Sequence, residues 1–186
     1  MAPHQLAHTD ELELIARSRV SGDADCFGEL IRRHQSQLRL FLLRLCREPS
    51  LADDLAQDAL MHAFEKLDGF RGDGSFAGWL MRIAWTTFLQ SRRRADRYRQ
   101  VVELAAQEPA ATSTSPAQDE VSDLDRLLAV LTTDERAIMI LAYSCGMSHS
   151  EISKAVDLPV GTVKSVIHRS KQKIRQDFEI DNHQFG

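Results

Sequence analysis

Side chains that can bind DNA recur on one face of the segment from Val160 to Arg175. Apolar residues at spacings of three and four predict a helix with a buried stripe formed by Val160, Val163, Ile167, Ile174 and Phe178. The opposite face is basic, and it also carries hydroxyl and amide groups, which can reach base edges or phosphates in a major groove. The candidate DNA-contacting residues are Gly161, Thr162, Lys164, Ser165, His168, Arg169 and Gln172.

The residues just before this segment predict a shorter helix and a tight turn. Ser148 and Glu151 have the spacing of a capping box, in which each side chain accepts a hydrogen bond from the other residue's backbone. The short helix must end at Asp157, because Pro159 disfavours a helical residue before it and suits the first position of the next helix. Two helices in this order are typical of a DNA-binding helix-turn-helix. The alternative is a helical hairpin with an ordinary solvated face.

Composition limits the other possibilities. The chain has 186 residues and a formal net charge of −4, so any DNA contact must come from local basic patches. Its three cysteines have no CxxC spacing, which indicates buried free thiols in a reducing cytoplasm. No signal-peptide core and no membrane-spanning stretch is present in the sequence, and no insertion into a membrane is expected.

The first half of the chain predicts three helices. The first is capped by Thr9 and closed by Gly22, with Leu12, Ile15 and Ala16 facing inward. The second is capped by Asp23 and ended by Pro49. The third begins at Ser50 and runs to about Leu67, with an apolar side formed by Leu55, Ala59, Ala63, Phe64 and Leu67. Its other side is acidic and polar, and comprises Asp53, Asp54, Gln57, Asp58 and Glu65.

A glycine-rich loop at residues 70–74 precedes a helix that Ser75 can cap. That helix carries aromatic residues including Trp79 and Trp85, and it ends in a run of arginines. Two interpretations remain open for these residues. They form either a core helix with a basic C-terminus, or a site where aromatic rings stack on unpaired bases and arginines contact phosphates.

Residues 108–118 are rich in Pro, Ala, Thr and Ser and lack an apolar period, which is typical of a flexible linker. The residues from Thr132 to Glu135 then predict a capped helix that runs to Tyr143, with Gly146 after it. The expected fold class is therefore all-α, with two small helical domains joined by a linker. We assign the first domain to residues 1–100, the linker to 101–121 and the helix-turn-helix domain to 122–186.

Motifs for catalysis are missing from the sequence. There is no glycine-rich phosphate loop, no nucleophile motif and no His-Cys cluster at metal-ligand spacing. We expect neither an enzyme nor a bound metal or cofactor.

The order of these motifs resembles the extracytoplasmic-function (ECF) group of bacterial RNA polymerase sigma factors. In the first half, the resemblance is carried by Ala52 to Asp58 (ADDLAQD), Phe64, Phe70 to Gly72 (FRG), Ser75-Phe76 and Gly78 to Ala84 (GWLMRIA). In the second half it is carried by Leu131, Asp134 to Arg136 (DER), Glu151-Ile152, Gly161 to Ser165 (GTVKS) and His168-Arg169. It extends from about Glu11 to Gln176.

The resemblance implies an alternative sigma factor that binds core RNA polymerase and directs promoter recognition and melting. The first domain would dock on the polymerase clamp through Asp54, Gln57 and Asp58. It would also hold the nontemplate strand of the −10 element at the loop and the following helix, through Phe70, Arg71, Asp73, Ser75, Trp85, Thr86, Arg92 and Arg93. The second domain would read the −35 element and contact the polymerase flap. The resemblance also implies an anti-sigma factor as a partner.

Two positions depart from the family's pattern. Thr86 stands where the family usually has Asn, and a hydroxyl cannot make an amide's bidentate contact with a base. Val166 stands where the recognition helix usually has Arg. The family's −10 and −35 base preferences are therefore not carried over to this chain.

Two other classes of protein are alternatives to a sigma factor. One is a stand-alone helix-turn-helix regulator, which needs a ligand or dimerisation domain that residues 1–120 do not reveal. The other is a protein-binding helical adaptor, in which the basic helix ends are surface features. Co-purification with core polymerase distinguishes a sigma factor from these alternatives.

Overall fold

The described part of the chain is helical in a computed structural model, which describes Leu6 and residues 9–105 and 123–184. The helices of the first half are α2 (Glu11–Ser21), α3 (Ala24–Cys46), α4 (Pro49–Lys66), the short 3-10 helix η1 (Leu67–Gly69) and α5 (Phe76–Ala105). Those of the second half are α6 (Asp123–Ala129), α7 (Thr133–Tyr143), α8 (His149–Val156) and α9 (Val160–Gln184). No strand occurs within these ranges, which confirms the all-α prediction.

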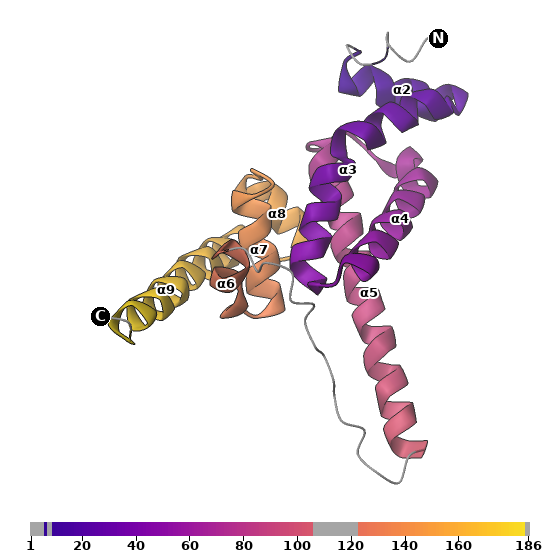
Figure 1. The fold of residues 1–186 in the computed structure, drawn as a ribbon. Helices are drawn as coiled ribbons and strands as arrows, with labels where there is room; N and C mark the ends of the chain where they lie inside the picture. The colour runs from indigo at the N-terminus through magenta and orange to yellow at the C-terminus, as the bar shows by residue number, and fades with distance from the viewer. Residues whose placement is uncertain (1–5, 7–8, 106–122, 185–186) are drawn as a thin grey trace.

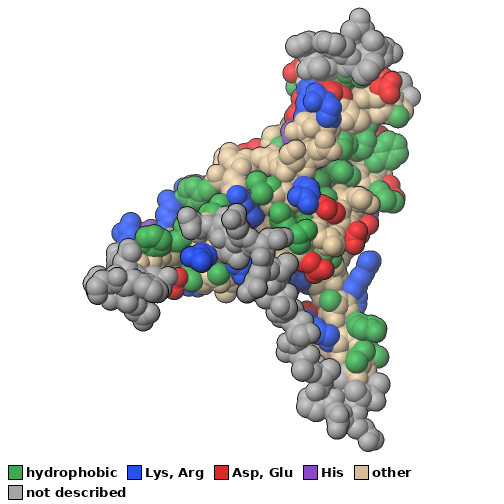
Figure 2. Space-filling view, viewed as in Figure 1, with side chains coloured by type: hydrophobic (Ala, Val, Ile, Leu, Met, Phe, Trp, Pro, Cys, Tyr) green, Lys and Arg blue, Asp and Glu red, His purple; other side chains and the backbone are tan. Residues whose placement is uncertain are grey.

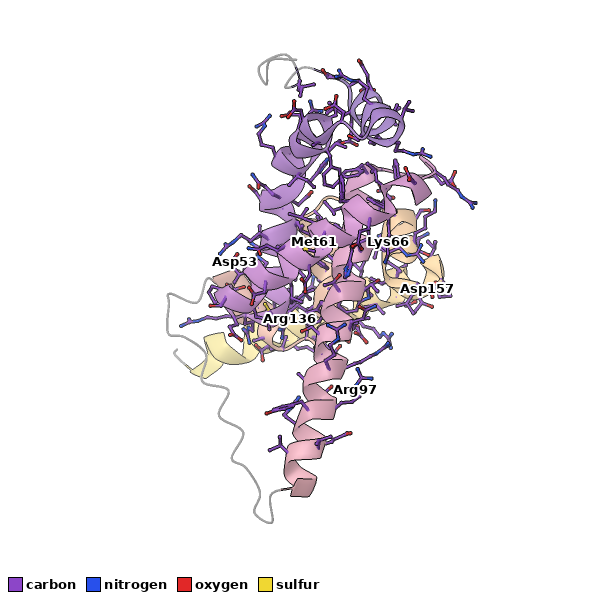
Figure 3. All side chains as sticks on the ribbon, turned by 90° about the vertical axis from the view of Figure 1, so that its right-hand side faces the viewer. Asp53, Met61, Lys66, Arg97, Arg136 and Asp157 are labelled. Atoms are coloured by element: carbon purple, nitrogen blue, oxygen red, sulfur yellow. The ribbon has the colours of Figure 1, made fainter. Side chains whose placement is uncertain are left out.

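Helices α3, α4 and α5 pack side by side to form the core of the first domain (Figure 1). Leu30, Leu38, Phe41 and Leu42 of α3 are fully buried against α4 and α5. Helix α4 contributes small residues such as Ala59 and Ala63, which let the neighbouring helices approach closely. The C-terminal half of α5 projects beyond this bundle, and Arg97 lies on the projecting part (Figure 3).

Several predicted boundaries in the first domain need correction. Asp10, not Thr9, caps α2 and accepts a hydrogen bond from the Leu12 amide. Helix α3 ends at Cys46, where Arg47 takes the left-handed conformation with a φ of 60°. Pro49 does not end α3 but begins α4, where its missing N–H leaves no donor unsatisfied, and Ser50 is not a cap.

Some residues predicted to be buried are exposed. The exposed fraction is 66% for Leu12 and 56% for Phe64, and Ala16 also faces solvent. In α2, Ile15 is buried as predicted, together with Leu14. Because α2 and the end of α4 lie at the edge of the bundle, each has a neighbour on only a narrow part of its surface.

The second domain follows the prediction more closely. Thr132 caps α7 in a complete capping box with Glu135, and Gly146 adopts a φ of 66° just after the helix. Ala137, Ile138, Ile140 and Leu141 bury α7 against its neighbours. The helices α8 and α9 then pack on α7 and on each other.

The two domains are also in direct contact. Helix α3 packs against α7, and α5 packs against α8. The first five residues of the predicted linker, 101–105, continue α5, and residues 106–122 lie outside the described residues. In the part of the chain that is described, no helix is long and apolar enough to cross a membrane.

Candidate nucleic-acid and polymerase interface

The helix-turn-helix is fixed by hydrogen bonds at both ends of α8. At its start, the Ser148 hydroxyl accepts from the Glu151 amide at 3.3 Å, and the Glu151 carboxylate accepts from the Ser148 amide at 2.9 Å. At its end, Asp157 takes a left-handed conformation with a φ of 57°, and the Leu158 amide donates to the Ser153 carbonyl at 3.1 Å. The capping box and the helix end were both predicted from the sequence, and both are confirmed.

Pro159 was predicted to be the first residue of the second helix, but it lies one position before that helix. Helix α9 begins at Val160, and the Pro159 carbonyl accepts the hydrogen bond from the Val163 amide at 3.0 Å. Proline supplies this carbonyl while its fixed φ keeps the turn short. The turn therefore sets the direction in which α9 leaves α8.

One face of α9 is buried and the other is free. Val163 and Ile167 are 0% and 6% exposed, whereas Val160 and Phe178, which were predicted to be buried, are 37% and 57% exposed. The buried stripe is thus shorter than the sequence indicated, since the packing of α6, α7 and α8 on α9 leaves its two end positions exposed. All seven candidate DNA-contacting residues are exposed: Gly161, Thr162, Lys164, Ser165, His168, Arg169 and Gln172.

The cations of α9 differ in how they are held. Lys173 donates to both carboxylate oxygens of Glu135 at 2.7 and 2.9 Å, and Lys171 lies 5.0 Å from the centre of the Tyr143 ring. Lys164 and Arg169 form no ion pair among the described residues. These two candidate side chains are therefore free to contact DNA.

The loop at residues 70–75 rests on an aromatic cluster. The Phe70 ring is 5% exposed and lies 5.4 Å from the Trp79 ring and 5.9 Å from the Phe76 ring. Gly72 and Gly74 have φ values of 76° and 153°, a region that residues with a side chain rarely adopt. Phe70 therefore anchors the loop, and the side chains of Arg71, Asp73 and Ser75 are left exposed.

A pocket of about 390 Å³ opens beside this loop. Its walls combine the loop, the start of α5 and three residues of α8, namely Glu151, Lys154 and Ala155. Trp79 supplies an aromatic surface, and Arg71 and Arg82 supply cations. Ser75 also caps α5 as predicted, since its hydroxyl accepts from the Gly78 amide at 3.1 Å.

The candidate residues farther along α5 are split between core and surface. Trp85 is 6% exposed and stacks on Phe88 at 5.7 Å, so neither ring offers a free face in this structure. Thr86 is exposed, and its hydroxyl donates to the Arg82 carbonyl at 2.9 Å. Arg92 lies 5.9 Å from the Phe88 ring centre and, like Arg93, is exposed.

Helix α4 presents a polar surface away from the core. Asp54, Gln57 and Asp58 are exposed, as expected. Asp53 is instead held by Arg39, whose guanidinium donates to its carboxylate at 2.5 Å and lowers the pKa of Asp53. Asp53 is therefore occupied within the domain.

Two apolar residues extend the acidic surface and were missed from the sequence. Met61 and Phe64 are 63% and 56% exposed, and the Phe64 ring contacts Phe27 edge-on at 5.0 Å. Figure 2 shows hydrophobic side chains gathered over α4 with acidic ones beside them. The available signal was their spacing from Gln57, which is four residues for Met61 and seven for Phe64, because these spacings place them on the same side of the helix.

The cysteines are free, and they show no sign of reactive chemistry. Cys26 is fully buried, and burial raises the pKa of its thiol. Burial also raises the pKa of Cys145 to about 11. Within the described ranges, no group of three or more His, Cys, Asp or Glu residues is arranged to hold a metal ion.

Comparison with known proteins agrees with these features in both domains. The family model for sigma-70 region 2 matches residues 30–98, and the model for sigma-70 region 4 matches residues 122–174. The first contains α4, the loop and most of α5, and the second contains the helix-turn-helix.

Whole-chain relatives have the same arrangement. The chain is 30% identical to the RNA polymerase sigma factor NccH of Alcaligenes xylosoxydans over 87% of this chain and 91% of the relative. It is 30% identical to the ECF sigma-E factor of Escherichia coli over 82% of this chain and 86% of that one. It is also 26% identical to the ECF sigma factor SigW of Bacillus subtilis, over 89% and 97%.

Solved structures support the same assignment. The sigma factor RpoE in complex with the anti-sigma factor NepR from Bartonella quintana matches with a TM-score of 0.69 at 27% identity, over 83% of this chain and 98% of that one. CnrH in complex with the cytosolic domain of CnrY also matches at 0.69, with 26% identity over 92% and 99%. The chain belongs to the ECF group of RNA polymerase sigma factors. It is an alternative sigma factor for transcription initiation.

Proposed function

We propose that three surfaces of this sigma factor make the contacts needed for initiation, each with a different part of the promoter or polymerase. The exposed face of α9 reads the −35 element. The loop at residues 70–76 and the exposed part of α5 hold the nontemplate strand of the −10 element. The acidic face of α4, at Asp54, Gln57 and Asp58, docks on the polymerase clamp, and the second domain also contacts the flap.

The observation that carries this proposal is the free face of α9 behind a fully formed helix-turn-helix. Lys164 and Arg169 lie on that face without an ion pair among the described residues. Val163 and Ile167 are buried on the opposite face and fix the helix against the domain. Arginine makes bidentate hydrogen bonds to guanine, and lysine neutralises phosphate. A helix held in this way can lie in a major groove.

The loop at residues 70–76 supports the −10 assignment. Arg71 and Asp73 offer a donor and an acceptor to a base edge, and the two glycines at positive φ let the backbone approach the strand. Extruding a base from the stack costs a few kcal/mol, and a preformed pocket offsets that cost. Phe70 and Trp85 are buried here, so stacking on either ring requires local rearrangement.

The polymerase contact is supported by the mixed character of α4. Asp54 and Asp58 supply charge, and the neighbouring Met61 and Phe64 supply apolar surface that is exposed in the isolated chain. Apolar centres with polar rims are typical of protein interfaces. The chain acts where core polymerase is, in the cytoplasm, and its role as an initiation factor is not catalytic.

An anti-sigma factor is a further partner in this proposal. The solved structure of RpoE is a complex with the anti-sigma factor NepR, and that of CnrH is a complex with the cytosolic domain of CnrY. Both match this chain across nearly their whole length, so the same class of protein is expected to hold this sigma factor inactive.

Co-purification with core polymerase tests the docking surface. The double variant Asp54→Lys/Asp58→Lys should stay folded, because both side chains are exposed, and should fail to co-elute with core polymerase. A double variant with the same change of charge at exposed residues outside α4, Glu13→Lys/Asp177→Lys, is the control and should co-elute normally. Co-elution of both variants would show that α4 is not the docking surface.

A further inference from the structure

Helix α2 takes no part in the proposed function, although it lies beside the loop at residues 70–76. The match to the family model for sigma-70 region 2 begins at residue 30, so α2 precedes the matched residues. In the structure α2 packs on α3 and on the short helix η1, which leads directly into the loop. Leu14 and Ile15 are buried in this packing. Helix α2 is therefore placed to support the loop.

Arg19 connects the end of α2 to the start of the loop. Its guanidinium donates to the Phe70 carbonyl at 3.3 Å and to the Asp68 carbonyl at 3.1 Å. Its Nε also lies 4.0 Å from the Asp68 carboxylate. A planar guanidinium can bind two neighbouring acceptors at once, whereas a lysine ammonium acts as a point charge. Arg19 therefore fixes the direction of the backbone where the chain leaves η1.

The middle of the loop has few hydrogen bonds of its own. Residues 71–74 make no hydrogen bond with another described backbone group. The Lys154 ammonium reaches this part of the loop and donates to the Asp73 carbonyl at 2.6 Å. The two glycines at positive φ also leave the backbone free to take several paths. The path of the loop therefore depends on how its two ends are held.

Each end of the loop is fixed in a different way. At the far end, the Ser75 hydroxyl accepts from the Gly78 amide at 3.1 Å, which ties the loop to α5. At the near end, the buried Phe70 ring holds its own side chain, and the Arg19 guanidinium holds the backbone on both sides of Gly69. A buried ring leaves the backbone able to rotate about φ and ψ, so the two carbonyl contacts set the direction of the residues that follow.

Helix α2 is itself fixed, which gives the guanidinium a rigid base. In the first turn of α2, the Glu11 carboxylate lies 2.8 Å from His34 Nε2 of α3. The His34 ring lies 5.4 Å from the ring of Phe76, a member of the aromatic cluster beneath the loop. Nearer the other end, Arg17 donates at 2.9 Å to the carboxylate of Asp23, the residue that caps α3. Movement of α2 away from the loop would break all of these contacts.

We propose that Arg19 is a positioning residue for −10 recognition, which holds the loop so that Arg71 and Asp73 meet a base edge in one orientation. Arg19 acts through the two carbonyls and does not contact DNA. When a loop samples several orientations, its apparent affinity falls to the fraction of time spent in the competent one. A correct base needs that orientation, whereas a wrong base is bound without those hydrogen bonds and loses less. The proposal rests on the −10 assignment of the loop.

The variant Arg19→Ala tests this role in holoenzyme assembled from core polymerase and the full chain. Permanganate footprinting gives the rate of open-complex formation on promoters that differ only at the −10 element. The discrimination ratio is the rate on the preferred −10 sequence divided by the rate on a sequence with one base pair changed. We expect this ratio to fall by about threefold to tenfold in Arg19→Ala, and by less in Arg19→Lys, which can still donate to one carbonyl. Affinity for the −35 duplex should stay unchanged.

The discrimination ratio separates positioning from a general loss of stability. A variant that merely unfolds a share of the chains lowers the rate on every promoter by the same factor and leaves the ratio unchanged. Arg17→Ala is the matched control, because it removes a cation of the same helix whose partner, Asp23, lies outside the loop. Asp68→Asn is a second control, because it removes the carboxylate near Arg19 and keeps the carbonyl. Both controls should keep the wild-type ratio.

Salt dependence distinguishes positioning from a direct contact between Arg19 and DNA. Loss of a phosphate contact reduces the salt slope of promoter binding by about one unit, whereas positioning predicts equal slopes for the wild type and Arg19→Ala. A wild-type ratio in Arg19→Ala, a reduced salt slope, or an equal fall of the ratio in either control would overturn the proposal. Absence of any −10 preference in the wild-type holoenzyme would contradict the proposed function of the loop, and the role of Arg19 with it.

Discussion

Arg169 and Lys173 lie four residues apart on α9 but should differ sharply in their contribution to DNA binding. Arg169 is exposed and forms no ion pair with any described residue. Lys173 is held by both oxygens of Glu135, whose pKa is lowered by the hydrogen bond from Lys173 against the opposing effect of burial. We predict that Arg169→Ala weakens binding to a −35 duplex and that Lys173→Ala changes it little.

The size of the effect follows from the contact that is lost. A bidentate contact between arginine and a base contributes about 1–3 kcal/mol, so the dissociation constant should rise by about fivefold to 160-fold. If Arg169 reads a base, the loss should shrink when that base pair is changed. If it contacts a phosphate, binding should weaken on all sequences and the salt slope should fall by about one unit.

The assay is fluorescence anisotropy. The full chain is added to a labelled duplex that carries the −35 element mapped for the holoenzyme, and the titration is repeated at several salt concentrations. Both variants change one cation to alanine on the same helix, so general electrostatics is matched between them. Equal losses for Arg169→Ala and Lys173→Ala, or no loss for Arg169→Ala, would refute the assignment of the free face as the reading surface.

Three other perturbations have definite expected outcomes. Exchanging residues 70–76 for another family member's loop should change the preferred −10 sequence and leave the −35 preference untouched, as read by permanganate footprinting on a −10 promoter library; an unchanged preference would make the loop a mere connector. Ile152 is 0% exposed, so Ile152→Ala should cost about 2–5 kcal/mol and raise hydrogen exchange in α7, α8 and α9 more than in α3; uniform exchange would contradict separate domain cores. Hydrogen bonds from Arg32 and Arg33 lower the pKa of Glu29 to about 2 from its ordinary 4.5, so their stabilisation is present above pH 4.5 and is lost as the pH falls toward 2. Between pH 4.5 and about 2, the urea midpoint of Glu29→Gln should therefore change less than that of the wild type. Equal changes in the two midpoints over this pH range would contradict a stabilising interaction of Glu29 with Arg32 and Arg33.

Local structure could be predicted from the sequence where side chains act on their own backbone. The capping boxes at Thr132 and Ser148 depend on residues three apart, and both form as expected. The left-handed ends at Gly22 and Gly146 follow from the freedom of glycine. The left-handed conformation of Arg47 had no such signal.

Burial was predicted less well, because the spacing of apolar residues does not reveal how much of a helix surface the neighbouring helices cover. Phe64 and Phe178 continue the apolar stripes of α4 and α9, yet both are more than half exposed, since the neighbouring helices leave most of each side chain uncovered. Exposure of Phe64 is also what adds apolar surface to the proposed polymerase contact. A residue that violates the expected pattern at a helix face is often functional.

The contact between the domains lay beyond sequence reasoning. Lys154 meets Asp73 across 81 positions, and Gln37 meets Cys145 across 108. Neither pair has a spacing that any local rule uses. Only the assembled structure brings the loop and α8 together.

Open-complex formation with purified core polymerase tests the central claim most directly. Permanganate reactivity of thymines is measured on a promoter of this sigma factor with core polymerase alone, with the wild-type chain and with Asp54→Lys/Asp58→Lys. The account predicts reactive thymines at the −10 element only when core polymerase and the wild-type chain are both present. Melting by core polymerase without the chain, or equal melting with the double variant, would contradict it.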